Sequence, residues 1–281
     1  MQNILRSDFN FTKMHGLGND FIIIDQRSSF HPLTTAFVSA ISDRHFGVGC
    51  DQVVEIMNSD EADAELTFWN SDGSPAETCG NATRCVADLL MRESERESLC
   101  LRTRRGLLSC TRNLHGHVVV NMGTPVLDWM NVPLASDVDT LHLPLPGDPV
   151  ATGLGNPHCS FFVESISDIN IHTEGPRFEI HPLFPLKTNV QFSQIISRSE
   201  IKTRIWERGA GLTLASGSGA CAAVVAGIRR GYLDHHVSVR LDGGQLDISW
   251  DGSPESGVFM AGPCSYIFAG SFFERYLSEQ H

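Results

Sequence analysis

Short hydrophobic runs that alternate with polar positions, or that are rich in β-branched residues, recur along the whole chain and predict a protein built mainly of strands. Helical periodicity is clear in only two segments, residues 80–93 and 217–230. The second is apolar on nearly every side and rich in alanine and glycine, which predicts a buried, closely packed helix. The strands are predicted at residues 21–25, 52–57, 65–69, 118–121, 159–163, 189–196, 202–206 and 237–241.

The four residues GLGN occur at positions 16–19 and again at 153–156, a shift of 137 positions that is close to half the chain. Three further segments are paired by the same shift: Gln52-Val53 with Asn189-Val190, Phe68-Trp69-Asn70 with Ile205-Trp206-Glu207, and Cys79-Gly80 with Ser216-Gly217. Separate matches at a single shift predict an internal duplication.

The duplication predicts an α/β (α+β) fold of two pseudo-symmetric halves, each a mostly antiparallel sheet wrapped around a central helix. The N-terminal half, residues 1–135, carries Cys79, and the C-terminal half, residues 136–281, carries Ser216. Prolines and polar residues at about 125–150 suit a crossover between the halves. We expect a pseudo-symmetric active site in the cleft between them.

The chain has 281 residues, of which 41% are hydrophobic, so it can fill a globular core. It carries 21 Lys and Arg against 33 Asp and Glu, and its net charge of −12 argues against a nucleic-acid or acidic-membrane partner. A small-molecule ligand is more consistent with this net charge than either of those partners. Without a long apolar run or a secretory signal, a cytoplasmic location is expected.

The eight cysteines should therefore be reduced, and most should be small core residues. None forms a C-x-x-C pair, so no metal site is expected. The chain also lacks a GxGxxG fingerprint and a Walker loop, and we expect no cofactor.

Cys79 precedes a glycine at the start of the first predicted helix. Free backbone N–H groups and the helix dipole lower the pKa of a cysteine at this place, which makes Cys79 a candidate nucleophile or base rather than another buried thiol. Ser216 holds the equivalent place in the second half. The N–H groups of Gly80, Asn81, Gly217 and Ser218 could then hold one carboxylate.

An acid or base on each face of a carbon atom suits removal of a proton from one side and its return on the other, which inverts a stereocentre. Glu207 could hold an ammonium group and Arg208 a carboxylate, unless they form a surface ion pair. His158 could tune a nearby thiol, although a core histidine is an equal interpretation. Amides that could bind amino and carboxylate groups, or serve as turn residues, are Asn19, Gln52, Asn70, Asn156 and Asn189.

Six motifs, in this order and along nearly the whole chain, resemble the diaminopimelate epimerase family: KMHGLGNDFIIID, RHFGVGCDQ, FWNSDGSPAETCGNATRC, GNPHC, NVQF and WERGAGLTLASGSGACAA. The resemblance implies a pyridoxal-phosphate-independent isomerase of two pseudo-symmetric halves. It would interconvert LL- and meso-2,6-diaminopimelate for lysine and peptidoglycan synthesis, and it could form a homodimer.

The resemblance also implies roles for single residues. Cys79 matches one catalytic cysteine, Ser216 stands in place of the other, and His158 and Glu207 match residues that adjust the thiol pKa values. The matching substrate-binding positions are Asn19, Gln52, Asn70, Gly80, Asn81, Asn156, Asn189, Glu207, Arg208, Gly217 and Ser218.

Ser216 departs from the family motif, which reads ACGSGACA or ACGTGACA. A hydroxyl is much less acidic than a thiol, so two-base inversion should be reduced or abolished. Because the rest of the motif is intact, we interpret Ser216 as a deliberate Cys-to-Ser change in a functional epimerase. Two alternatives are a one-base lyase or isomerase acting on another amino acid and a non-catalytic diaminopimelate-binding protein.

Overall fold

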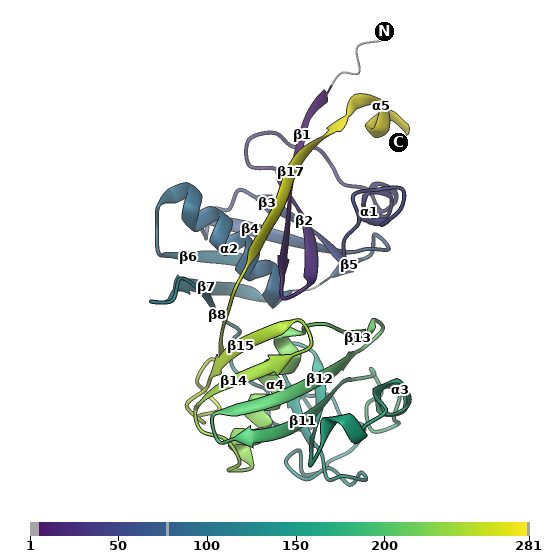
Figure 1. Ribbon diagram of the computed structural model, residues 1–281, viewed down its shortest axis with the longest axis vertical. Coiled ribbons are helices and arrows are strands. Elements are labelled where there is room, and N and C mark those ends of the chain that lie inside the picture. Colours follow the sequence, from purple (N-terminus) through teal and green to yellow (C-terminus); the bar gives the residue numbers. More distant parts are fainter. Residues whose placement is uncertain (1–5, 77–78, 280–281) are drawn as a thin grey trace. The chain divides into compact units, whose positions relative to one another are not determined.

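The computed structural model describes residues 6–76 and 79–279 and divides into two compact units, which Figure 1 shows as a ribbon. Unit 1 comprises Met1–Val118 and Pro263–His281, and unit 2 comprises Val119–Gly262. All eight predicted strands and both predicted helices are present. Glu77 and Thr78, which precede Cys79 in its motif, lie outside the described residues.

Unit 1 is a mixed sheet with helices. Its first strands pair in the order β17, β1, β2, β3, β4, and all of these pairs are antiparallel except β2 with β3. Beyond β4 the sheet continues through a parallel pair with β6 and then an antiparallel β7. The elements are β1 (Arg6–Gly16), β2 (Asn19–Asp25), α1 (Thr35–Ser42), β3 (Gln52–Met57), β4 (Ala64–Asn70), β5 (Pro75–Ala76), α2 (Gly80–Ser94), β6 (Ser98–Thr103), β7 (Gly106–Arg112), β17 (Ser265–Phe273) and α5 (Glu274–Glu279).

Unit 2 repeats this arrangement. Strands β9 to β12 pair in chain order, with one parallel pair between β10 and β11, and β12 continues in parallel to β14 and then to antiparallel β15 and β16. The elements are β9 (Val150–Gly153), β10 (Pro157–Val163), the 3-10 helix η1 (Ile166–Asp168), α3 (Ile171–Glu179), β11 (Asn189–Ser197), β12 (Glu200–Glu207), β13 (Gly211–Thr213), α4 (Gly217–Arg229), β14 (His236–Leu241), β15 (Gly244–Ser249) and β16 (Phe259–Gly262). The short β8 (Val118–Asn121) spans the unit boundary and pairs with β16.

The register of the strands supports the predicted duplication. Phe21 pairs with Gln52 between β2 and β3, and His158 pairs with Asn189 between β10 and β11, so both partners move by the same 137 positions. The antiparallel pair Val53 with Trp69 recurs in the same way as Val190 with Trp206. The two units are therefore copies of one fold down to the pairing of single residues.

Helices α2 and α4 are the crossovers that parallel strand pairs require, from β4 to β6 and from β12 to β14. The sequence predicts α4 to be buried, and the structure confirms it: the helix contacts β9, β10, β11, β12, β14, β15 and β16 of unit 2. Small residues make this close packing possible. A Cβ atom at Gly227 would lie 2.3 Å from Leu233 Cδ1, so the leucine would have to shift to admit any larger residue.

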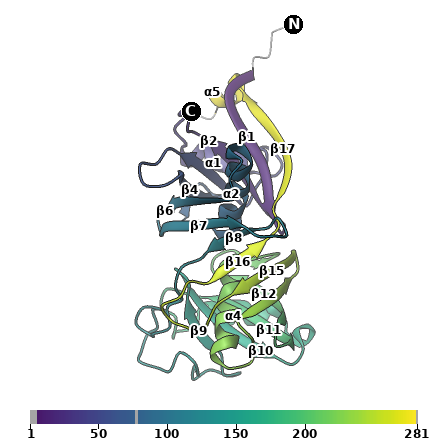
Figure 2. The ribbon, with the colours of Figure 1, turned by 90° about the vertical axis from the view of Figure 1, so that its left-hand side faces the viewer.

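The two units differ from the predicted halves at both ends. The chain returns to unit 1 after Gly262, because β17 pairs along the length of β1, and Figure 2 shows the two strands running side by side. The segment at 125–150, expected as a crossover, packs onto unit 2. Its apolar side chains Val132, Leu134 and Leu143 are buried in the core of that unit.

Candidate active site

The first GLGN motif forms a tight hairpin that places Asn19. Gly16 pairs with Asn19 across β1 and β2, and the two residues between them, Leu17 and Gly18, have φ angles of 58° and 87°. Two consecutive positive φ angles are typical of a type I′ turn, which favours glycine at its second position. Asn19 is therefore the first residue of β2, at the edge where the hairpin turns.

The second GLGN motif forms a looser loop. Gly153 pairs with Pro157, so Leu154, Gly155 and Asn156 all lie in the connection between β9 and β10, and of the three only Gly155 has a positive φ angle. Asn156 is thus a loop residue, whereas Asn19 belongs to a strand. The same four residues therefore form different local structures in the two units.

Cys79 is the N-cap residue of α2. Its Sγ atom accepts a hydrogen bond from Ala82 N at 3.5 Å, and the same thiol donates to Asn19 Oδ1 at 3.7 Å. Asn81 Nδ2 also donates to this oxygen, at 3.2 Å. Three predicted site residues from β2 and α2, Cys79, Asn19 and Asn81, therefore lie in direct contact.

Gln52 and Asn70 form a second polar pair in unit 1. They are directly opposite each other on β3 and β4, and Gln52 Nε2 donates to Asn70 Oδ1 at 3.2 Å. Asn70 Nδ2 in turn donates to Ser74 Oγ at 3.1 Å. Both predicted amides lie at the end of the strand pair, where neither is fully buried.

Ser216 occupies the same place in unit 2 as Cys79 does in unit 1. It is the N-cap residue of α4, and its Oγ atom accepts a hydrogen bond from Gly219 N at 3.3 Å. The hydroxyl donates to Glu207 Oε2 at 3.0 Å, which brings two more predicted residues together. Gly80 and Asn81 begin α2, and Gly217 and Ser218 begin α4, so their N–H groups point out of the helix N-termini.

Asn189 holds the strand end that carries Arg208. Its Oδ1 atom accepts from Arg208 N at 2.9 Å, and its Nδ2 atom donates to Pro157 O at 3.0 Å. The guanidinium of Arg208 donates to Leu186 O at 2.9 Å. Both ends of the buried Asn189 amide thus bind backbone groups of unit 2, so this residue organises the site locally.

His158 is fully buried on β10, and its ring is held at both nitrogens. Nε2 lies 2.7 Å from Asn156 Oδ1, and Nδ1 lies 2.9 Å from Gln191 Nε2. Gln191 Oε1 accepts from Ser160 Oγ at 2.9 Å. Sequence reasoning missed Gln191 and Ser160, although Gln191 stands within the quoted NVQF motif.

Glu179, the last residue of α3, is a second residue that sequence reasoning missed. Its carboxylate accepts from Trp206 Nε1 at 2.7 Å and from Gly209 N at 3.1 Å, on either side of Glu207 and Arg208. In unit 1 the equivalent Trp69 donates to a different carboxylate, Glu55. The tryptophan repeated at positions 69 and 206 was the sequence feature that could have indicated a buried carboxylate partner in each unit.

Most of the remaining cysteines have properties of structural thiols. None of the eight, all within the described residues, forms a disulfide, and most are buried. Burial raises the pKa of Cys110 to about 12 and lifts that of Cys159 far above its usual range. Thiols of this kind react slowly, because the thiolate is the reactive form.

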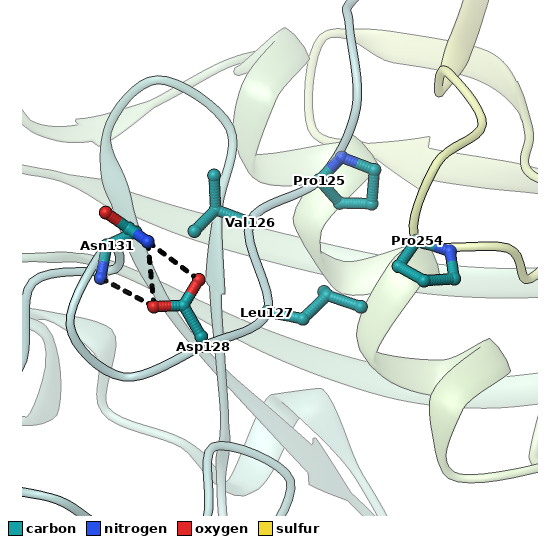
Figure 3. A pocket seen from close by; sticks show the side chains of 6 residues that line it. All are labelled: Pro125, Val126, Leu127, Asp128, Asn131 and Pro254. Carbon is teal, nitrogen blue, oxygen red and sulfur yellow. Dashed lines mark hydrogen bonds between the residues drawn. The ribbon is translucent and has the colours of Figure 1, made fainter.

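Three further observations concern features outside this set of residues. Among the residues that the structure describes, no group of three or more metal-ligating side chains is found. Within the same residues, no helix is both long and apolar enough to span a membrane. A pocket in unit 2, seen in Figure 3, contains no predicted site residue; it is lined by Pro125, Val126, Leu127, Asp128, Asn131 and Pro254.

The duplicated α/β fold, with Cys79 and Ser216 as the N-cap residues of equivalent helices in its two units, is shared with solved structures of a racemase and an epimerase. A solved hydroxyproline epimerase from Agrobacterium vitis has this fold, with a TM-score of 0.66 at 14% identity, covering 96% of this chain and 94% of that one. A probable proline racemase from Agrobacterium radiobacter also has a TM-score of 0.66, at 13% identity, covering 95% of this chain and 93% of that one.

The chain belongs to the diaminopimelate epimerase family, whose model matches residues 11–127 and 150–267. The diaminopimelate epimerase of Rhodospirillum centenum is 45% identical over 273 residues, covering 95% of this chain and 93% of the relative. That of Acidiphilium cryptum is 46% identical over 266 residues, covering 92% and 95%. The family predicted from the sequence motifs is therefore confirmed.

Proposed function

We infer that this chain is an isomerase that interconverts LL- and meso-2,6-diaminopimelate by proton transfer at the α-carbon. The observation that carries the proposal is the equivalence of Cys79 and Ser216, which are the N-cap residues of corresponding helices in two copies of one fold. Family membership over both copies supports the substrate. The helix N-termini supply N–H groups suited to a substrate carboxylate.

We propose that Cys79 and residue 216 serve opposite faces of the same α-carbon. In one direction a thiolate removes the proton, and the other group returns a proton to the resulting carbanion from the opposite side. Glu207 contacts the group at 216, so it is suited to adjust the protonation of that group. We propose a similar role for His158, which family membership supports and whose buried ring is fixed beside Asn156.

The substrate's polar groups would be bound by a set that both units supply. We propose that Arg208 binds a carboxylate and that Glu207 contributes to binding an ammonium group. The remaining members of this set are Asn19, Gln52, Asn70, Gly80, Asn81, Asn156, Asn189, Gly217 and Ser218.

Ser216 limits the reaction in this chain. Its hydroxyl donates to Glu207 Oε2, so the proton that the group would have to lose is held in a hydrogen bond. An aliphatic hydroxyl is far less acidic than a thiol, and proton abstraction by its anion is correspondingly rare at neutral pH. We therefore propose that the chain is a Cys-to-Ser variant with reduced or no epimerase activity.

The test is Ser216→Cys, assayed by incorporation of solvent deuterium at the α-carbon of LL-diaminopimelate, followed by NMR. We expect the exchange rate to rise about 100-fold or more, because positioned acid–base groups contribute factors of this size. Cys79→Ala in the same background should abolish the gain, and Cys100→Ser should not.

The outcome separates the alternatives. If the Ser216→Cys protein binds diaminopimelate but exchanges no α-hydrogen, the epimerase proposal fails and a binding protein remains. If it exchanges the α-hydrogen of proline or hydroxyproline analogues instead, a lyase or isomerase on another amino acid is favoured.

The homodimer, the cytoplasmic location and the independence from cofactors and metals remain predictions. The side chains of Tyr266, Ile267 and Phe268 on β17 are 43%, 50% and 48% exposed, which supports a subunit contact on this strand. Sedimentation equilibrium of Tyr266→Ser/Phe268→Ser, compared with the unmodified chain, tests the dimer.

A further inference from the structure

The amide of Asn19 is held in one orientation by Asp51. Asn19 Nδ2 donates to Asp51 Oδ2 at 2.9 Å. A carboxylate accepts hydrogen bonds and offers none, so the amide must turn its nitrogen toward Asp51 and its oxygen away. That oxygen is the atom that accepts from Cys79 Sγ at 3.7 Å and from Asn81 Nδ2 at 3.2 Å.

Asp51 is itself held from several sides. Its Oδ2 atom also accepts from Asp20 N at 3.2 Å, and its Oδ1 atom accepts from Arg44 Nη2 at 2.8 Å. The backbone N–H of Asp51 donates back to Asp20 Oδ1 at 2.9 Å. Both carboxylate oxygens are therefore engaged, and rotation of the side chain away from Asn19 would break bonds to a backbone group and to a guanidinium.

Asp20 extends the cluster into the protein. It accepts from both terminal nitrogens of Arg44, at 3.0 and 2.8 Å, and from Lys13 Nζ at 2.6 Å. Lys13 is only 5% exposed and also donates to Gly49 O. The starts of β2 and β3 are thus joined by charged side chains directly behind Asn19.

Unit 2 has no counterpart of this cluster. The shift of 137 positions places Asp20 on Pro157, Arg44 on His181 and Asp51 on Thr188. Asn156, the repeat partner of Asn19, instead presents its oxygen to His158 Nε2 at 2.7 Å. Each unit therefore has a side chain that caps the N-terminus of its central helix, but the units differ in how the neighbouring amide is oriented.

We propose that Asp51 is a positioning residue that turns the oxygen of Asn19 toward Cys79. The thiol of Cys79 then keeps its proton in a hydrogen bond to this oxygen until the proton is transferred to the substrate carbanion. This inference rests on the proposed function of Cys79 as an acid–base group. A helix N-terminus favours the thiolate, whereas an accepting oxygen favours the thiol. Asp51, acting through Asn19, shifts the balance toward the proton-donating form.

The test is the alkylation rate of Cys79 by iodoacetamide at pH 7, measured residue by residue with mass spectrometry on the chain with Ser216. In Asp51→Ala the amide loses the partner of its nitrogen and can turn that nitrogen toward the sulfur. We expect alkylation about fivefold faster, the factor that corresponds to one hydrogen bond of about 1 kcal/mol. Cys100, which lies on β6 and is only partly buried, is measured in the same digest as an internal reference.

Asp51→Asn is the matched control, because it removes the same negative charge but keeps an oxygen. That oxygen can accept from Asn19 Nδ2 and from Asp20 N, so the rate should stay within about twofold of the unmodified chain. Equal acceleration in Asp51→Ala and Asp51→Asn would show that the charge acts directly on Cys79 and would overturn the proposal.

A double-mutant cycle tests whether Asp51 acts through Asn19. Asn19→Ala removes the accepting oxygen, so it should accelerate alkylation about fivefold, and Asp51→Ala should add nothing in that background. Additive effects would overturn the proposal. If Asp51→Ala does not fold, Asp51→Thr, which carries the residue found at the equivalent place in unit 2, replaces it with the same expectations.

Alkylation of Cys79 requires no catalytic turnover, so this experiment tests the positioning role of Asp51 independently of the proposed epimerase activity. If Ser216→Cys exchanges no α-hydrogen while the alkylation pattern holds, the epimerase proposal is wrong and the positioning role of Asp51 stands. If exchange occurs but alkylation is insensitive to Asp51→Ala, the epimerase proposal stands and the positioning role of Asp51 is wrong.

Discussion

Gln191 and His158 are joined by a 2.9 Å hydrogen bond between Gln191 Nε2 and His158 Nδ1 in the core of unit 2. Ser160 Oγ donates to the other end of the glutamine amide, which leaves the donor nitrogen facing the ring. His158 Nδ1 must therefore accept, and the ring proton lies on Nε2, where it is donated to Asn156 Oδ1. The arrangement favours a neutral imidazole.

Gln191→Glu should reverse this preference. A carboxylate accepts from Nδ1–H, and with Asn156 accepting at Nε2 both ring nitrogens would face acceptors. We expect the pKa of His158 to rise, because an adjacent negative charge favours the imidazolium. The ¹⁵N chemical shifts of the imidazole nitrogens, assigned with a His158→Gln sample, measure the change.

The control for this substitution is Gln194→Glu, on the same strand, whose side chain accepts from Ile166 N rather than from a histidine. It should leave the His158 signals in place. Unchanged nitrogen shifts in Gln191→Glu would contradict the tautomer deduced from the hydrogen bonds.

Much of the fold can be predicted from the sequence because the duplication provides two copies of each element, and each copy supports the prediction made for the other. Both major helices and eight strands were predictable from periodicity, and the shift of 137 positions placed equivalent residues on equivalent strands. Strands such as β6, β7 and β17 were missed because their exposed faces carry apolar or mixed residues that break the alternation. Helices α1 and α3 were missed because each is short, and Pro176 lies inside α3.

The candidate site was predictable at positions where a side chain able to transfer protons also falls on a position paired by the internal duplication, as at Cys79 and Ser216. The supporting residues were not, because their function depends on partners far apart in the chain. Asp51 lies 32 positions from Asn19, and Gln191 lies 33 from His158. Hydrogen bonds across strands of this separation leave no periodic signal in a single sequence.

Asp20 should make unit 1 sensitive to acid. Burial by itself would raise the pKa of this carboxyl, but hydrogen bonds from Arg44 and Lys13 outweigh it and lower the pKa to about 2, from 3.8. Because the pKa is lower in the folded state, the stabilisation is fully present above pH 4 and is lost as the pH falls from about 4 to about 2. We expect a contribution of about 1–2 kcal/mol, since water screens the half-exposed Arg44.

Asp20→Asn removes this contribution. Urea unfolding followed by circular dichroism should show that the substitution lowers the free energy of unfolding at pH 6 and that the difference from the unmodified chain shrinks toward pH 2.5. Asp60→Asn, the same change at an exposed loop position, should have little effect at either pH. A difference that is constant with pH would argue against the ion pairs of Asp20 as the cause.

Glu179 should be required for the geometry of the turn that carries Glu207 and Arg208. Its two oxygens accept from Trp206 Nε1 and Gly209 N, which lie on either side of that pair, and the side chain is buried. Glu179→Ala leaves the indole N–H without its acceptor, and we expect the free energy of unfolding to fall by about 1–3 kcal/mol. Tryptophan emission should shift as the indole surroundings change.

The functional consequence of Glu179→Ala is measured in the Ser216→Cys background, where the proposed exchange of the α-hydrogen reports on the turn. Because Glu207 contacts residue 216 and Arg208 follows it, the exchange rate should fall at least about tenfold when the turn loses its carboxylate clamp. Glu174→Gln is the matched control on the same helix. It breaks only the exposed ion pair with Arg177 and should change stability by less than about 0.5 kcal/mol and leave exchange intact. Equal effects of the two substitutions would show that α3 as a whole, and not the Glu179 carboxylate, supports the turn.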